Sequence, residues 1–130
     1  AMGQIRRTVP AADVVITNPT HYAVALKYDT VRAAAPFVVA KGTDDIALFI
    51  REVAKEHKIE IVEFPTLARS VYFTTQLNQQ IPHQLFRAIA HVLTYVLQLK
   101  SWRAGMQDKP QLNRHISIPK EVLKQDAEKH

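Results

Sequence analysis

One short segment of the sequence, Asn18-Pro19-Thr20-His21, has the residue types of a self-cleavage site. The side-chain amide nitrogen of an asparagine can reach its own main-chain carbonyl carbon and close a five-membered ring. The competing deamidation needs the main-chain N–H of the next residue, which Pro19 lacks. The reaction that remains is attack of the Asn18 side-chain nitrogen on the Asn18 carbonyl carbon, with the Pro19 nitrogen as leaving group. The segment is therefore a candidate for backbone cleavage between Asn18 and Pro19.

The two following residues can assist this reaction. Ring closure is slow in a loose peptide, but a fold that holds the reacting atoms together supplies effective molarities of roughly 10⁵–10⁸ M. The residue before a proline is conformationally restricted, which helps to hold Asn18. The Thr20 hydroxyl can tighten the turn or donate to the developing oxyanion. The His21 imidazole exchanges protons near neutral pH and can relay them directly or through water.

Each of these residues also has an ordinary structural interpretation. Asn-Pro is a common turn dipeptide, and a threonine that follows it is typical of a turn or of the start of a strand. A single histidine is more often a hydrogen-bonded structural residue than a proton relay. The residues alone therefore leave a simple turn and a self-cleaving turn both open.

The hydrophobic pattern predicts which elements hold this segment. Short apolar or alternating runs indicate four strands, at residues 14–17, 23–28, 37–41 and 59–64. Helical spacing, with Thr43 as N-cap and Pro65 and Pro82 at first helical positions, indicates three helices, at residues 44–57, from residue 65 onward and at 82–99. The inner faces of these helices are predicted to comprise Ile46, Phe49, Ile50, Val53, His57, Leu67, Ala68, Val71, Tyr72, Leu85, Ile89, Val92, Val96 and Leu99.

These elements predict an α/β fold. We expect a small mixed four-stranded sheet, built as β-turn-β and then βαβ, flanked by three to four helices, with a mobile C-terminal tail. The strands around Asn18 should be close neighbours, with the turn at one edge of the sheet. We assign residues 1–7 to a tag remnant and the end of a linker, 8–103 to the domain, and 104–130 to a flexible basic tail that can include a short helix at 119–128.

Composition limits the possible functions. The chain has 130 residues, no cysteine and a net charge of +5, so disulfides and thiolate metal sites are excluded and one domain is expected. Residues 8–99 carry eight basic and eight acidic side chains, so the positive charge lies at the two ends. Because the central part of the chain is neutral, a nucleic-acid-binding face on the domain is not expected. The basic ends are typical of segments that contact a partner or an anionic surface.

Other classes of catalytic protein fit the sequence poorly. An N-terminal-nucleophile hydrolase cuts before Ser, Thr or Cys, whereas here Pro19 follows the scissile bond. His83 and His91 are eight residues apart on one expected helix, and no further ligand is placed to complete a metal site. We therefore expect no cofactor, no metal and no turnover enzyme. An interaction module that does not cleave itself is the main alternative.

Three segments in order resemble the cytoplasmic domain of the FlhB/YscU/SpaS family of type III export-gate switch proteins. They read ADVVITNPTHYAVALKYD, then APFVVAKGTDDIALFIREVAKEHKIEIVEFPTLARSVY, then IPHQLFRAIAHVLTYVLQL, and they cover about residues 8–103. The resemblance implies that Asn18 cleaves its bond to Pro19, that Thr20 and His21 support the reaction, and that the two fragments stay in one fold. The flagellar branch fits best, with the needle-type injectisome branch as the alternative.

The resemblance also implies a place in the cell and a set of partners. The family's domain follows transmembrane helices, so we expect it at the cytoplasmic face of the bacterial inner membrane. Its task is to switch export from rod and hook subunits to filament subunits. The implied partners are a hook-length-control protein, other export-gate components such as FlhA, rod/hook-type export substrates and the chain's own N-terminal transmembrane domain, with no nucleic acid.

Overall fold

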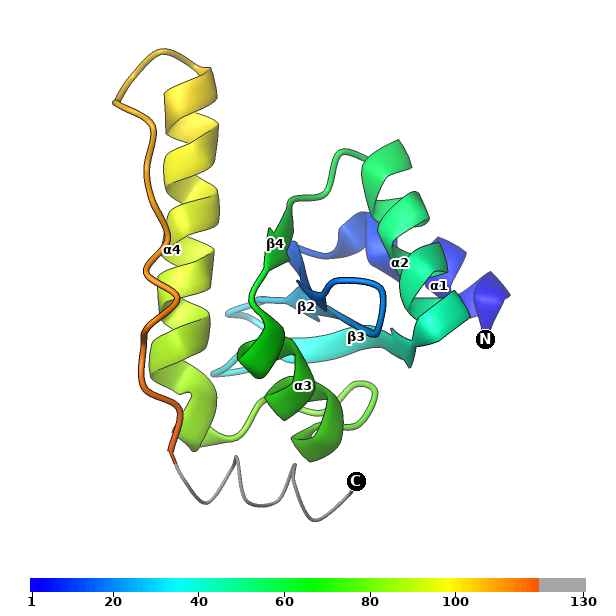
Figure 1. The fold of residues 1–130 in the computed structure, drawn as a ribbon. Coiled ribbons are helices and arrows are strands. Elements are labelled where there is room, and N and C mark those ends of the chain that lie inside the picture. The colour runs from blue at the N-terminus through cyan, green and yellow to red at the C-terminus, as the bar shows by residue number, and fades with distance from the viewer. Residues whose placement is uncertain (120–130) are drawn as a thin grey trace.

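The computed structural model describes residues 1–119 of the chain and has an α/β fold (Figure 1). Two 3₁₀ turns, at Val9–Ala11 and His83–Leu85, accompany the helices and strands. In chain order the elements are α1 (Met2–Thr8), β1 (Val14–Asn18), β2 (Tyr22–Lys27), β3 (Phe37–Thr43), α2 (Asp44–Glu56), β4 (Ile61–Glu63), α3 (Pro65–Thr74) and α4 (Phe86–Arg103). The predicted strands are confirmed, although the last is shorter than the predicted 59–64.

The four strands form one mixed sheet in the order β3-β2-β1-β4. The hairpin β1–β2 and the pair β2–β3 are antiparallel, whereas β1 and β4 are parallel. Strands β3 and β4 therefore run in the same direction and are joined through α2, as the βαβ prediction required. The expectation that the turn after Asn18 lies at one edge of the sheet is wrong. Because β3 adds beside β2 and β4 beside β1, the hairpin is the inner pair of strands, and the turn projects from its end.

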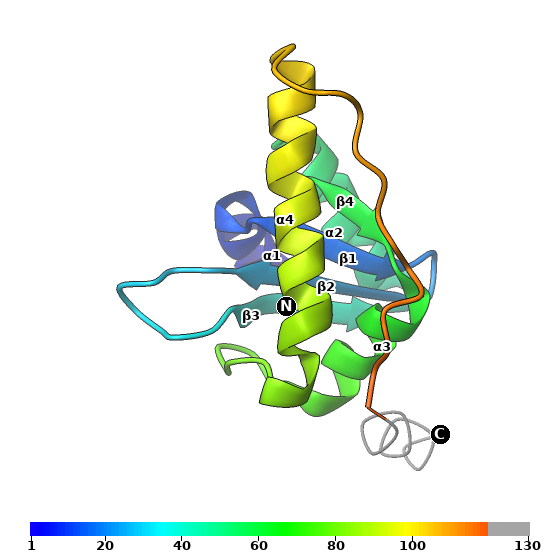
Figure 2. The same cartoon turned by 90° about the vertical axis from the view of Figure 1, so that its left-hand side faces the viewer.

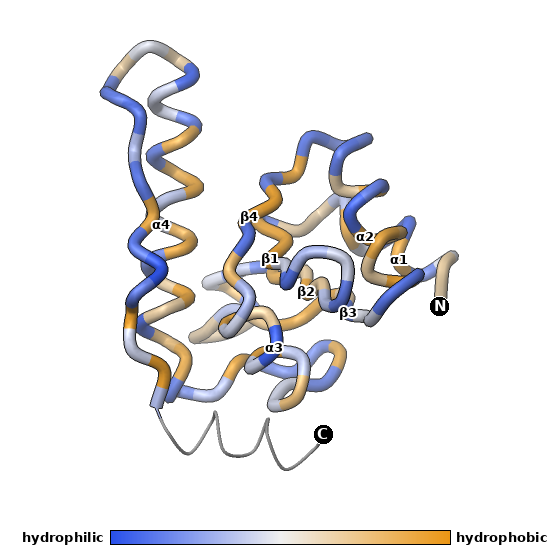
Figure 3. The backbone as a smooth tube through the Cα atoms, viewed as in Figure 1, coloured by the Kyte–Doolittle hydropathy of each residue, from blue (hydrophilic) through white to orange (hydrophobic). Residues whose placement is uncertain are grey.

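Helices cover both faces of the sheet and give two hydrophobic cores. Successive strand residues point to opposite faces, so β1 and β2 contribute to both cores. Helices α1 and α2 pack on one face with Val15, Ala23 and Ala25. Helices α3 and α4 pack on the other face with Val14, Ile16, Val24 and Leu26 (Figures 1 and 2). Figure 3 shows the hydrophobic positions along the strands and recurring along α4.

The helices follow the predicted pattern with two differences. Helix α2 begins at Asp44 after the Thr43 N-cap, but His57 is exposed because the helix has ended. Helix α4 begins at Phe86 instead of at Pro82, since His83–Leu85 forms a tighter 3₁₀ turn first. Its predicted inner stripe is buried throughout, namely Leu85, Ile89, Val92, Val96 and Leu99. Within residues 1–119 no helix combines the length and the apolar character needed to cross a bilayer.

The N-terminal residues contribute to the fold, which the sequence analysis did not expect. Residues Met2–Thr8 form α1, in which the Ile5 side chain is buried. The Arg6 guanidinium lies over the Phe49 ring of α2, 5.0 Å from its centroid. The first residues therefore help to cover one face of the sheet.

The segment after α4 also packs on the domain. Residues 104–119 run back beside α4 (Figure 2), with Ile118 buried and Leu112 and Ile116 packed against the core. The Arg114 Nε donates a hydrogen bond to the Glu63 carbonyl oxygen at 2.6 Å. The expectation of a flexible tail from residue 104 is therefore wrong up to residue 119, because these apolar residues have a surface to bury against. The rest of the expected tail, including most of the 119–128 helix, lies outside the described residues.

Candidate self-cleavage site

Residues 18–21 form one tight turn at the end of the central hairpin. Asn18 and Tyr22 are partners in the β1–β2 register, and the His21 N–H donates a hydrogen bond to the Asn18 carbonyl oxygen at 3.0 Å. Pro19 occupies the second position and Thr20, with φ of +72°, the third. Proline followed by a residue with positive φ is the pattern of a type II turn. The structure thus brings the four predicted site residues together in a single turn.

The hydrogen bond to the Asn18 carbonyl bears directly on the predicted chemistry. Attack on this carbonyl carbon places negative charge on the carbonyl oxygen, and a donor already aimed at that oxygen stabilises the charge. The donor in the structure is the main-chain N–H of His21. From the sequence, the Thr20 hydroxyl is expected either to tighten the turn or to donate to this oxygen. A main-chain donor is the better candidate because the turn itself fixes its position.

Thr20 holds a strained backbone conformation. A left-handed conformation costs a residue with a Cβ atom about 1–2 kcal/mol, and β-branched residues adopt it rarely. The Thr20 side chain is exposed, whereas Asn18 and Pro19 are half-buried. The turn that contains Thr20 is held on both sides by the pairing of Asn18 with Tyr22. Cleavage on its N-terminal side would release the strain.

His21 lies beside the first residue of α2. The Asp44 N–H donates a hydrogen bond to the His21 carbonyl oxygen at 3.0 Å. The His21 Nδ1 is 3.6 Å from the Asp44 Oδ1, and the two side chains are 69% and 75% exposed. That distance fits a charge pair between a protonated imidazole and a carboxylate, and it is too long for a hydrogen bond. The imidazole is also open to water, which a proton relay requires.

Aromatic contacts from α3 anchor the residue that follows the turn. The Tyr22 ring meets the Tyr72 and Phe73 rings edge-on, with centroids 5.2 and 5.7 Å away. The Arg69 guanidinium lies 5.5 Å from the centroid of the Tyr22 ring. A shallow polar hollow of about 310 Å³ beside the turn is lined by His21, Tyr22, Thr43, Asp44 and Arg69. Arg69 of α3 therefore lies at this hollow together with His21 and Asp44.

Gly42 allows α2 to begin close to the turn. A Cβ atom at Gly42 would lie 2.2 Å from the Ile46 Cγ2, which is far inside van der Waals contact. Thr43 is the register partner of Tyr22, so the start of α2 is fixed next to the end of the hairpin. Asp44 is in the first turn of α2, where a carboxylate is common for helix-dipole reasons alone. Its contact with His21 depends on the β2–β3 register, which no local pattern reveals.

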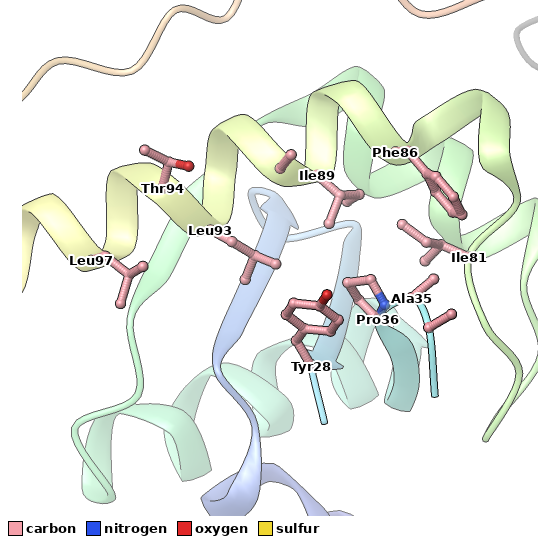
Figure 4. Close-up of a pocket in the computed structure, with 11 residues that line it drawn as sticks. Tyr28, Ala35, Pro36, Ile81, Phe86, Ile89, Leu93, Thr94 and Leu97 are labelled. Carbon is pink, nitrogen blue, oxygen red and sulfur yellow. The ribbon is translucent and has the colours of Figure 1, made fainter. Parts of the chain in front are cut away.

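A second hollow, of about 360 Å³, lies at the opposite end of β2 (Figure 4). It is bounded by the β2–β3 connection and by α4, and most of its lining is apolar. The exposed fractions of Phe86 and Leu97 are 45% and 64%. The lining residues are Tyr28, Ala34, Ala35, Pro36, Ile81, Phe86, Ile89, Ala90, Leu93, Thr94 and Leu97. Across residues 1–119, no three His, Asp or Glu side chains lie close enough together to hold a metal ion.

Comparison with known proteins identifies the family. A family model described as the FlhB, HrpN, YscU and SpaS family matches residues 1–96. The chain belongs to this family. It is 47% identical over 119 residues to the flagellar biosynthetic protein FlhB of Salmonella typhimurium and 49% identical over 100 residues to that of Bacillus subtilis. These alignments cover 92% and 77% of the chain, but only 31% and 28% of the relatives, so the chain spans about a third of their length.

Solved structures of family members have the same fold. The cytoplasmic domain of FlhB from Shewanella putrefaciens is 51% identical, with a TM-score of 0.89, and the match covers 94% of this chain and 95% of that one. A C-terminal domain of EscU is 29% identical, with a TM-score of 0.70, over 72% of this chain and 94% of that one. The resemblance found in the sequence is thus confirmed at the level of family and fold, and the flagellar domain is the more similar of the two.

Proposed function

We propose that this chain cuts its own backbone between Asn18 and Pro19 and that the cut domain takes part in switching the specificity of flagellar type III export. One observation carries the first half of the proposal. The Asn18 carbonyl is held in a tight turn by the His21 N–H at 3.0 Å, with Pro19 as the leaving residue and Thr20 at a φ of +72°. Three features favour ring closure: the Asn18 carbonyl is polarised by its hydrogen bond, the Asn18 side chain is restricted by the turn, and the backbone after the leaving nitrogen is strained at Thr20.

The reaction conserves every atom of the chain. The Asn18 side-chain nitrogen forms a bond to the Asn18 carbonyl carbon and loses one proton. The bond from this carbon to the Pro19 nitrogen breaks, and that nitrogen gains one proton, relayed by water or by the His21 imidazole. The products are a chain ending in a succinimide at residue 18 and a chain beginning with a free secondary amine at Pro19. Water later opens the succinimide to a carboxylate.

The relatives support the choice of this bond. The EscU C-terminal domain has been solved with substitutions at an asparagine, to alanine and to aspartate, and with the proline directly after it changed to alanine. Asn18-Pro19 is the one Asn-Pro pair in the present chain. These substitutions lie on both sides of one Asn-Pro peptide bond, which supports assigning the cleavage to the bond between Asn18 and Pro19.

Cleavage is a single turnover, and both fragments remain in the domain. Strand β1 is paired with β2 on one side and with β4 on the other, so we expect it to remain in the sheet after the cut. Its residues Val14, Val15 and Ile16 are completely buried, and burying each such side chain is worth about 1.5–3 kcal/mol. The proposed reaction is therefore one self-cleavage per chain and not turnover catalysis, because its substrate is the chain itself.

The proposed consequence is local release of the turn. Before cleavage, residues 18–22 are tied at both ends and present one fixed surface. Afterwards Pro19 carries a positive amine and residue 18 a carboxylate or succinimide, while the sheet stays intact. Structures of the wild type and of Asn18→Ala should therefore superimpose outside residues 17–22 and differ inside them. A movement of α2 or α4 between the two would contradict local release.

The partners are proposed from family membership. They are a hook-length-control protein, other gate components such as FlhA, rod/hook-type export substrates and an N-terminal transmembrane domain that holds this one at the inner membrane.

The apolar hollow between the β2–β3 connection and α4 is the natural candidate surface for an apolar segment of a substrate. Leu97→Asp should weaken such binding, because Leu97 lines the hollow and is exposed. Leu48→Asp, on the exposed side of α2, should leave it unchanged.

The first test compares the domain under native and denaturing conditions. We expect the wild-type domain to separate into two fragments in denaturant and to migrate as one species under native conditions. The Asn18→Ala domain should migrate as one unbroken chain under both conditions. One unbroken chain for the wild type would favour a non-cleaving interaction module.

For the export role, full-length protein carrying Asn18→Ala should leave flagellated cells secreting rod and hook subunits without the change to filament subunits. Rescue of an injectisome mutant in place of a flagellar mutant would favour the alternative branch.

A further inference from the structure

We infer that Asp44 is a positioning residue for the cleavage turn, acting through His21. This inference rests on the proposed self-cleavage at Asn18. Asp44 is outside the four-residue motif and reaches it only through the fold. It holds His21 in two ways, one through the main chain and one through the side chain.

The main-chain contact fixes the exit of the turn. The Asp44 N–H donates to the His21 carbonyl oxygen at 3.0 Å, while the His21 N–H donates to the Asn18 carbonyl oxygen, also at 3.0 Å. The His21 peptide groups are thus held from both sides, so the donor aimed at the Asn18 carbonyl has little freedom to turn away. Asp44 has a φ of +49°, a left-handed conformation that aspartate tolerates better than most residues. The chain adopts it where α2 begins, close against Gly42.

The side-chain contact orients the imidazole. With the Asp44 Oδ1 at 3.6 Å from the His21 Nδ1, the carboxylate attracts a proton onto Nδ1. At this distance the carboxylate makes no hydrogen bond to the ring and acts through its charge alone. That charge favours the neutral tautomer with the proton on Nδ1, which leaves Nε2 as the nitrogen that accepts or passes on a proton. Both side chains are exposed, so water screens the attraction and its effect is small. We expect a rate effect of about two- to fivefold, which is the range for an exposed charge pair.

The decisive variant is Asp44→Asn. Asparagine keeps the main-chain N–H, the side-chain shape and the tolerance of positive φ, but removes the negative charge. Asp45→Asn is the matched control, because Asp45 shares the first turn of α2 and lends the same favourable charge to the helix end. Asp44→Asn should slow cleavage about two- to fivefold, and Asp45→Asn should leave the rate unchanged.

A double variant separates positioning from a general structural effect. In a His21→Ala background, Asp44→Asn should have no further effect, because its carboxylate acts on the imidazole. Equal slowing in both backgrounds, equal slowing by Asp45→Asn, or a wild-type rate for Asp44→Asn would each overturn the inference.

Nitrogen-15 NMR of the uncleaved chain tests the contact independently of any cleavage. In the Asn18→Ala background we expect the His21 ring in the neutral form to carry its proton on Nδ1, and Asp44→Asn to shift the population toward Nε2–H. An unchanged tautomer population would refute the side-chain contact. A wild-type chain that never cleaves, with the tautomer shift present, would instead refute the proposed function and leave the contact standing.

Discussion

Replacing Thr20 by glycine tests whether backbone strain drives cleavage. Thr20 has a φ of +72°, which costs a residue with a Cβ atom roughly 1–2 kcal/mol and glycine almost nothing. If the transition state releases about half of this strain, its loss slows cleavage about two- to fivefold, because each 1.4 kcal/mol is a factor of ten in rate.

The assay is the appearance of the Pro19 fragment with time after synthesis of the chain, followed by mass spectrometry. Two control variants separate the contributions of Thr20. Thr20→Val keeps the β-branch and the strain but lacks the hydroxyl, so it should cleave at about the wild-type rate. Thr20→Asn tolerates positive φ with less added freedom than glycine, so it should lie between wild type and Thr20→Gly. Cleavage of Thr20→Gly at or above the wild-type rate would refute the role of backbone strain. Strong slowing by Thr20→Val would mean that the Thr20 hydroxyl takes part in the reaction.

Three further substitutions follow from the same geometry. Pro19→Ala restores a main-chain N–H and weakens the turn, so mass spectrometry should find slower cleavage or deamidation of Asn18; a wild-type rate with no deamidation would contradict the role of Pro19. His21→Ala keeps the main-chain donor to the Asn18 carbonyl, so cleavage should slow but continue, with added imidazole restoring part of the rate. If His21→Ala cleaves at the wild-type rate at every pH, the imidazole is structural. Gly42→Ala places a methyl group against Ile46, and urea denaturation should show a loss of about 1–3 kcal/mol; unchanged stability would mean that α2 shifts freely.

The sequence was sufficient for the elements that depend on local patterns. Alternation around Val24 and Leu26 predicts β2, and the stripe from Leu85 to Leu99 predicts the buried face of α4. The chemistry of Asn18-Pro19 is also local, since it depends on one side chain and on the missing N–H of its neighbour. These predictions needed no knowledge of which surfaces meet in the fold.

The features that the sequence missed all depend on tertiary contacts. Helix α1 has a single buried side chain, Ile5, which is too weak a pattern to predict a helix. The segment 104–119 reads as a polar tail because Ile118 finds its partners only once α4 is in place. Asp44 reaches His21 through the pairing of Tyr22 with Thr43. In each case the deciding neighbour is remote in sequence or visible only in the register of the sheet.

The central claim is most directly tested by the intact mass of the fragment that ends at Asn18, measured from the earliest time after synthesis. Ring closure adds no water, so this fragment should first appear one water molecule lighter than a hydrolysis product and should gain that mass later. The Pro19 fragment should appear together with it, and Asn18→Ala should yield neither. A single 130-residue chain after prolonged incubation at neutral pH, a cut at another bond, or an Asn18 fragment that carries the full water mass from the first time point would contradict the account.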